Sequence, residues 1–198
     1  LLPYAFSGGT LPGTINVQPE TVALIIADIA DSLFAQGLMN IVVVLGHGGN
    51  ENFWAIQNLK HLYFHKRRHL YDRLLAVAPV WECSPTWMEI SARNLHNGDF
   101  HAGNNETSLM MYLAPGDVRR SKIATDPPRI LAAMRTDPDY YQLVEKVYDH
   151  PFVAPHVSQR PEIKVGVMGN PFDATESLGR KLATEASAGL AAFVRDIS

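Results

Sequence analysis

The sequence predicts an α/β protein in which a mostly parallel sheet is sandwiched between layers of helices. Two apolar runs, 41–45 and 74–81, have the composition of buried parallel strands. Segments with apolar residues at helical spacing lie before, between and after these runs. Helices that alternate with buried strands favour a three-layer α/β/α arrangement. We find no linker or repeat in the 198 residues and predict one domain over residues 1–198.

The first half of the chain is expected to contain two helices and two strands. Pro19–Gln36 has helical spacing, with a proline at its first position and Gly37 as its stop. The strand Ile41–Leu45 follows, and a helix then runs from Asn52 to about Arg73 with a break near residue 65. Leu74–Trp81 is the second strand. Its proline is expected at an end or a bulge because proline cannot donate to a ladder.

The second half has weaker patterns. Ser84–His96 is either helical or irregular, and Glu106–Leu113 is an apolar helical stretch that stops before a Pro-Gly pair. Ser121–Pro155 is rich in Pro, Asp and Tyr, and we expect a long excursion with a helix at about 140–147. A short strand is expected at Lys164–Met168. The sequence Asp173–Glu176 resembles a capping box, which predicts a terminal helix that runs to about residue 195.

The most informative motif is Gly-His-Gly-Gly-Asn at 46–50, directly after the first strand. Ligands of open α/β sheets bind beyond the carboxyl ends of the strands, and glycines let a ligand approach the backbone. His47 is therefore placed to do chemistry. The alternative is that Gly48, Gly49 and Asn50 only form a turn, with His47 there by chance.

A second motif, His-Ala-Gly-Asn-Asn-Glu-Thr-Ser, occupies 101–108. It separates His101 from Glu106 by a Gly-Asn-Asn turn and places Glu106 in the first turn of the following helix. The helix dipole favours a carboxylate there, and the same carboxylate can lean back toward a metal. The alternative is a plain cap, with Asn104 or Asn105 at the N-cap and Glu106 serving only the helix.

Together the two motifs resemble the creatininase family, the creatinine amidohydrolase-like metal-dependent amidohydrolases. Leu11–Ile15 and Gly166–Thr175 support the resemblance, and the four segments occur in the family's order over nearly the whole chain. The resemblance implies hydrolysis of a cyclic or linear amide C–N bond in a small-molecule substrate by a metal-activated water. It also implies a compact homo-oligomer.

The resemblance assigns roles to individual residues. His47 and Glu106 become ligands of divalent metal, two ions per site, for which Zn, Mn and Fe all suit imidazole. His101 becomes the catalytic residue that moves protons, because a histidine can exchange them at neutral pH. Glycines beside the two histidines would leave N–H groups for the substrate oxyanion. The residues expected to bind substrate are Gly48, Gly49 and Asn50.

The chain departs from the family in two places. Family members begin with a strand and a loop that carries Glu-x-His and then Asp, and nothing in residues 1–16 matches that segment. We expect a longer protein, a separate N-terminal fragment or a degenerate homologue without the metal site. Creatininases proper carry a Tyr-Glu pair where this chain has Gly48-Gly49, which favours an amide other than creatinine.

Composition fits a folded cytoplasmic protein. The net charge of −3 and pI near 6.2 give no basic surface for nucleic acid, and no apolar run is long enough for a membrane span. A single cysteine, Cys83, fits a reducing compartment. An alternative function is a non-catalytic homologue that acts as a binding or assembly protein. A phosphate-binding loop at 46–50 is disfavoured because the lysine of a P-loop is absent.

Other aromatic and basic residues remain open. His61, His65 and His69 recur every four residues but lack the carboxylate of a zinc motif, and we interpret them as surface or interface residues. Trp81 and Trp87 flank a strand end, where they either line a pocket or pack in the core.

Overall fold

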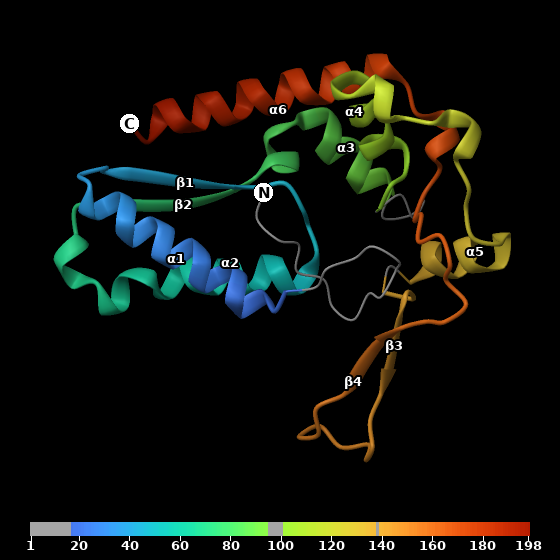
Figure 1. Ribbon diagram of the computed structural model, residues 1–198, viewed down its shortest axis with the longest axis horizontal. Coiled ribbons are helices and arrows are strands. Elements are labelled where there is room, and N and C mark those ends of the chain that lie inside the picture. The colour runs from blue at the N-terminus through green and yellow to red at the C-terminus, as the bar shows by residue number, and fades with distance from the viewer. Residues whose placement is uncertain (1–16, 95–100, 138) are drawn as a thin grey trace. The chain divides into compact units, whose positions relative to one another are not determined.

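Figure 1 shows the computed structural model, which describes residues 17–94, 101–137 and 139–198. The chain divides into two compact units. The described part of the first unit consists of residues 17–83 and 188–198. The described part of the second unit consists of residues 84–94, 101–137 and 139–187. The predicted single domain stays a prediction.

The first unit contains a parallel pair of strands and two helices. The helices are α1 (Pro19–Ala35) and α2 (Asn50–Leu62), and the strands are β1 (Asn40–Leu45) and β2 (Leu74–Pro79). The strands run parallel, from the pair Asn40–Leu74 to the pair Leu45–Pro79. Both predicted strands are present. The second ends at Pro79, two residues earlier than predicted, and Val80–Cys83 form a 3₁₀ turn, so the proline lies at the strand end as expected from its missing N–H group.

The core of the first unit lies between α1, α2 and the two strands. Residues of α1 one turn apart face the strands, because i, i+4 and i+8 share one side of a helix. Each large apolar side chain buried there contributes about 1.5–3 kcal/mol. The buried residues are Val22, Ile26, Ala27, Ala30, Phe34, Leu45, Ile56, Tyr63 and Leu75.

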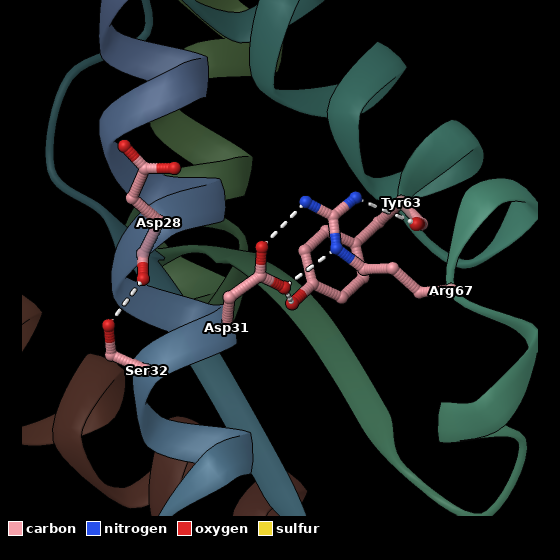
Figure 2. A network of polar contacts seen from close by, with 5 residues as sticks. All are labelled: Asp28, Asp31, Ser32, Tyr63 and Arg67. Atoms are coloured by element: carbon pink, nitrogen blue, oxygen red, sulfur yellow. Dashed lines mark hydrogen bonds and ion pairs between the residues drawn. The ribbon is translucent and has the colours of Figure 1, made fainter.

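The second predicted helix ends earlier than expected. Its α-helical part stops at Leu62, and two 3₁₀ turns follow, Tyr63–Lys66 and Arg68–Leu70. Figure 2 shows the tertiary contact at this point: the Tyr63 hydroxyl and the Arg67 guanidinium both donate to the Asp31 carboxylate of α1. The guanidinium also lies 4.2 Å from the centre of the Tyr63 ring. Asp31 of α1 thus holds the chain in a 3₁₀ turn at residues that the sequence pattern predicted to be α-helical.

The second unit contains α3 (Pro85–Asn94), α4 (Asn104–Leu113), α5 (Pro128–Thr136), β3 (Gln142–Glu145), β4 (His156–Gln159) and most of α6 (Glu176–Asp196). The last turns of α6 belong to the first unit, where the Asn40 side chain donates to the Ile197 carbonyl at 2.9 Å. Ile130, Met134 and Ile163 form the core of this unit around α5. In the described ranges no helix combines the length and the apolarity that crossing a bilayer requires.

The helix expected at 140–147 is wrong. Residues 142–145 form β3, which pairs antiparallel with β4 from Gln142–Gln159 to Glu145–His156. The helix lies upstream instead, as α5, with Pro128 at its first position and Ile130 and Met134 on its buried face. The short apolar run was ambiguous between helix and strand, and a partner strand from 156–159 decided the outcome.

Two further expectations for the C-terminal part are wrong. Residues 164–168 form no strand: Met168 makes a single antiparallel bridge, with His101. The N–H groups of 164–166 bind the Asp126 carboxylate instead of a strand. The predicted capping box is also displaced. The Thr175 hydroxyl accepts from the Leu178 N–H at 3.1 Å, and Asp173 lies in the preceding 3₁₀ turn.

Candidate functional site

The first motif lies between the end of β1 and the start of α2. Leu45, the last residue of β1, is buried in the core, and α2 begins at Asn50 with Gly49 at its N-cap. The N–H groups of a first helical turn have no partner within the helix and carry a partial positive charge. The predicted position of the motif, at the carboxyl end of a parallel strand, is therefore confirmed, and it adjoins a helix N-terminus suited to anionic groups.

Gly49 is required by the position of the His47 ring. A Cβ atom on Gly49 would lie 2.5 Å from Nε2 and 3.1 Å from Cδ2 of His47, well inside van der Waals contact. The imidazole thus folds back over the Gly49 backbone. Any side chain at position 49 would displace it.

Trp81 stands beside the same loop. A Cβ atom on Gly48 would lie 3.4 Å from Cη2 of Trp81, an ordinary contact. Trp81 also packs against the core cluster of Val22, Ile26 and Ile56. Core packing, one of the two alternatives for Trp81, is therefore confirmed, and Cη2 lies against the motif; the role as a pocket wall stays a prediction.

The second motif is held through the backbone of His101. The His101 N–H donates to the Met168 carbonyl at 3.1 Å, and the Met168 N–H donates back to the His101 carbonyl at 2.8 Å. Nδ1 of His101 lies 3.9 Å from Oε2 of Glu106. Both side chains are about half exposed, at 47% and 44%. The structure brings these two predicted residues together, with the imidazole about half exposed to solvent.

Glu106 also organises the turn between the two residues. Its Oε2 atom accepts the N–H of Ala102, whose φ of 51° is rare for a residue with a side chain. Gly103 occupies the N-cap, so the predicted cap by Asn104 or Asn105 is wrong. A carboxylate has about four lone-pair sites, so one accepted N–H leaves it able to bind a metal.

Helix α4 is seated tightly on α6 next to this turn. Ser108 is fully buried, and its hydroxyl accepts the Thr175 N–H at 3.0 Å and donates to the Asn104 side chain at 3.2 Å. A Cβ atom on Gly179 of α6 would lie 1.9 Å from the Ser108 carbonyl oxygen. The two backbones are in direct contact there, which fixes the helix that carries Glu106.

The chemical types of the candidate ligands, an imidazole and a carboxylate, are suited to a first-row divalent metal. An imidazole and a carboxylate are the ligands that Zn²⁺ and Mn²⁺ accept in proteins. Within the described ranges, no three His, Cys, Asp or Glu side chains gather in one group. His47, Gly48 and Gly49 belong to the first unit, whereas His101 and Glu106 belong to the second.

One functional candidate was missed from the sequence. Asp126, in a Pro-rich stretch that predicted only an excursion, is 2% exposed and accepts hydrogen bonds from the backbone beside the Met168 bridge. No local pattern marks it, because its partners lie about 40 residues further along the chain.

Comparison with known proteins identifies one family. A family model described as creatininase (creatinine amidohydrolase) matches residues 1–194. No curated protein sequence matches the chain.

Solved creatininase structures have a similar fold. A crystal structure of creatinine amidohydrolase superimposes with a TM-score of 0.67 at 22% identity, over 96% of this chain and 71% of its own. A structure named creatininase Mn gives 0.69 at 21% identity, over 98% and 72% of the two chains. A mutant creatininase of the Zn-Zn type gives 0.68 at 20% identity, also over 98% and 72%. These similarities confirm the predicted α/β fold.

Proposed function

This chain belongs to the creatininase family, and we propose that it is a metal-dependent amidohydrolase that cleaves the C–N bond of a small amide. Family membership supports amide hydrolysis as the general class of activity. The observation that carries the proposal is the second motif: a backbone-fixed, half-exposed His101 beside the carboxylate of Glu106. Manganese and zinc occur in the names of similar structures, which supports a divalent metal here.

We assign His47 and Glu106 as metal ligands. When bound, a divalent metal lowers the pKa of a water molecule and polarises an amide carbonyl. His101 takes the proton from water and delivers it to the leaving nitrogen, a task suited to an imidazole at neutral pH. Because Nδ1 of His101 is the ring nitrogen on the side of the Glu106 carboxylate, we assign Nε2 as the atom that exchanges the proton.

The substrate is assigned to the loop after β1. Gly48, Gly49 and Asn50 lie at the N-terminus of α2, whose N–H groups can stabilise a developing oxyanion. The edge of Trp81 beside Gly48 offers an apolar wall for the substrate. Two glycines supply no side chain for a polar ring substituent, so we propose a small amide other than creatinine.

The test is metal analysis combined with an amide screen. We expect purified protein to bind Zn, Mn or Fe and to hydrolyse at least one small amide. His47→Ala and Glu106→Ala should each lose metal and activity together. His156→Ala is a matched control, because this exposed histidine lies on β4 in the hairpin. It should keep both properties.

The role of His101 is tested separately from metal binding. His101→Ala should retain the metal and lower turnover by about 10²–10⁴-fold, the usual contribution of a positioned acid–base group. Normal metal content in both ligand variants would refute the ligand assignment. A wild-type protein that binds no metal and hydrolyses no amide would instead favour the binding or assembly protein.

A further inference from the structure

Asp126 is a buried carboxylate with an unusual set of partners. It is 2% exposed, and Oδ1 accepts the Lys164 N–H at 2.8 Å and the Val165 N–H at 3.1 Å. Oδ2 accepts the Gly166 N–H at 2.8 Å. Three successive backbone N–H groups thus surround one carboxylate, an arrangement that offsets the cost of burying its charge.

The segment that Asp126 holds leads directly to His101. Gly166 has a φ of 78°, which turns the chain, and Met168 follows two residues later. Met168 packs against the core of Ile130, Met134 and Ile163. Its N–H and carbonyl groups are the two partners of the His101 backbone. Asp126, the segment 164–168 and His101 therefore form one continuous series of contacts inside the second unit.

We propose that Asp126 is a positioning residue for His101. Its carboxylate fixes the backbone of 164–166, which in turn fixes the position of Met168. The backbone bridge from Met168 then holds His101 beside Glu106. The inference rests on the proposed function, because it gives His101 the proton-carrying role. Asp126 binds the backbone N–H groups of 164–166 and so acts on His101 through Met168.

Loss of the carboxylate should move the bridge. Asn at position 126 keeps one carbonyl oxygen but turns an NH₂ group toward backbone N–H donors, so at least one of them loses its acceptor. The segment would then move away and carry Met168 with it. A misplacement of about 1 Å at a reacting group can lower the rate about 10²-fold. The effect should fall on kcat rather than KM, since Asp126 does not lie in the loop assigned to substrate.

The experiment compares Asp126→Asn with a matched control in the same unit. Glu185 of α6 also accepts a backbone N–H, from Thr86 at 2.9 Å, and the hydroxyls of Ser84 and Thr86, both at 2.8 Å. Glu185→Gln also removes a carboxylate that accepts a backbone N–H, but these partners, Ser84 and Thr86, lie outside the segment 164–168. The readouts are the imidazole NMR signals of His101, assigned with His101→Ala, together with kcat, KM and Tm. Asp126→Glu restores the charge and serves as the conservative variant.

We expect Asp126→Asn to shift the His101 signals and to lower kcat about 10- to 100-fold with little change in KM. Asp126→Glu should recover part of both, and Glu185→Gln should lower Tm only. If Asp126→Asn lowers Tm but leaves the His101 signals and kcat as in Glu185→Gln, the inference is wrong. If Asp126→Asn fails to fold, Asp126→Glu takes its place, because its longer side chain displaces the carboxylate from the N–H groups of 164–166. A lowered Tm with wild-type His101 signals and kcat would then overturn the inference, and a lowered Tm with shifted signals would support it.

The NMR readout needs no substrate, so it separates this inference from the proposed function. A chain that hydrolyses no amide would refute the proposed function. The response of the His101 signals to Asp126→Asn would still decide whether Asp126 positions His101.

Discussion

At the scale of single residues, the first motif depends on the missing side chain of Gly49, and the second depends on the backbone conformation of Ala102. The His47 ring occupies the space where a side chain on Gly49 would begin. Ala102 adopts a left-handed conformation so that its N–H can reach the Glu106 carboxylate. Such a conformation costs about 1–3 kcal/mol and persists where surrounding contacts impose it. The missing side chain of Gly49 thus fixes where the His47 ring lies, and the left-handed backbone of Ala102 fixes the turn that carries Glu106.

The two glycines of the first motif give a direct test of this reading. Gly49→Ala should displace the imidazole and lower kcat/KM about tenfold or more, because small misplacements of a functional group are costly. Stability should change little, since the atom that must move is the end of a side chain. Gly48→Ala is the comparison within the same substrate loop: its Cβ would make an ordinary contact with Trp81 at 3.4 Å and would not displace His47.

The measurements for this pair are metal content, kcat/KM and Tm. We expect Gly49→Ala to lose metal or activity and Gly48→Ala to lose less of either. Equal activity in the two variants would mean that the ring position seen over Gly49 does not matter for function.

At the scale of elements, α4 and α6 approach so closely that only glycine fits at their crossing. Gly179→Ala would place a methyl group 1.9 Å from the Ser108 carbonyl oxygen. Forced overpacking of this kind typically destabilises a protein by about 1–3 kcal/mol. We expect a loss of that size in the free energy of unfolding, measured with urea.

Gly116→Ala is the control for the helix crossing. No atom lies within 4 Å of a Cβ built on Gly116, and its φ is not in the left-handed region. Its substitution should therefore be neutral or slightly stabilising, by up to about 1 kcal/mol. Equal unfolding free energies for the two variants would show that the two helices can separate without cost.

The contact between α1 and the first 3₁₀ turn should make stability depend on pH. The hydrogen bonds from Arg67 lower the pKa of the Asp31 carboxyl, and the Tyr63 hydroxyl adds to this effect. Burial and the same carboxylate raise the pKa of Tyr63, so its hydroxyl stays protonated as a donor. A carboxyl whose pKa is lower in the folded state stabilises the fold above its unfolded pKa of about 3.9. That contribution is lost as the pH falls through the folded pKa.

Asp31→Asn should therefore lower the unfolding free energy at pH 7 and reduce its further loss on acidification. Asp28→Asn is the control: it removes a carboxylate one turn away that acts on Arg67 only by a weaker charge–charge attraction, and its backbone carbonyl accepts the Ser32 hydroxyl at 2.9 Å. Urea unfolding at pH 7 and below pH 4 measures both quantities. If Asp31→Asn loses as much unfolding free energy on acidification as the wild type, Asp31 is not the cause of that loss.

At the scale of the whole molecule, the proposed metal, with His47 and Glu106 as its ligands, is expected to bind only the folded chain. A metal that binds only the folded chain raises its stability by mass action, by about 2.7 kcal/mol at one hundred times the Kd. We expect a chelator to lower Tm and added Zn²⁺ or Mn²⁺ to restore it. The Tm of His47→Ala should be the same with a chelator and with added metal. A Tm that ignores both chelator and metal would contradict a metal bound at these residues.

Assembly is a second property of the whole molecule. The homo-oligomer implied by the family resemblance stays a prediction. Large apolar side chains are exposed around the β3–β4 hairpin, with Val147 at 88%, Tyr148 at 69% and Phe152 at 93%.

The sequence by itself determined the features that local chemistry controls. The two parallel strands, the proline at the end of the second, the helices α1, α4 and α6 and the positions of both motifs follow from apolar spacing and from glycine and proline. The family could also be predicted, because its motifs are short and continuous in the chain.

Only the tertiary structure decided the features whose partners are distant in sequence. Residues 142–145 became a strand because 156–159 pair with them, and the helix after β1 stopped where Asp31 binds Tyr63 and Arg67. Asp126 appears significant only once residues 164–166 surround it. A local pattern carries no information about such partners, because the free energy of each contact depends on a segment elsewhere in the chain.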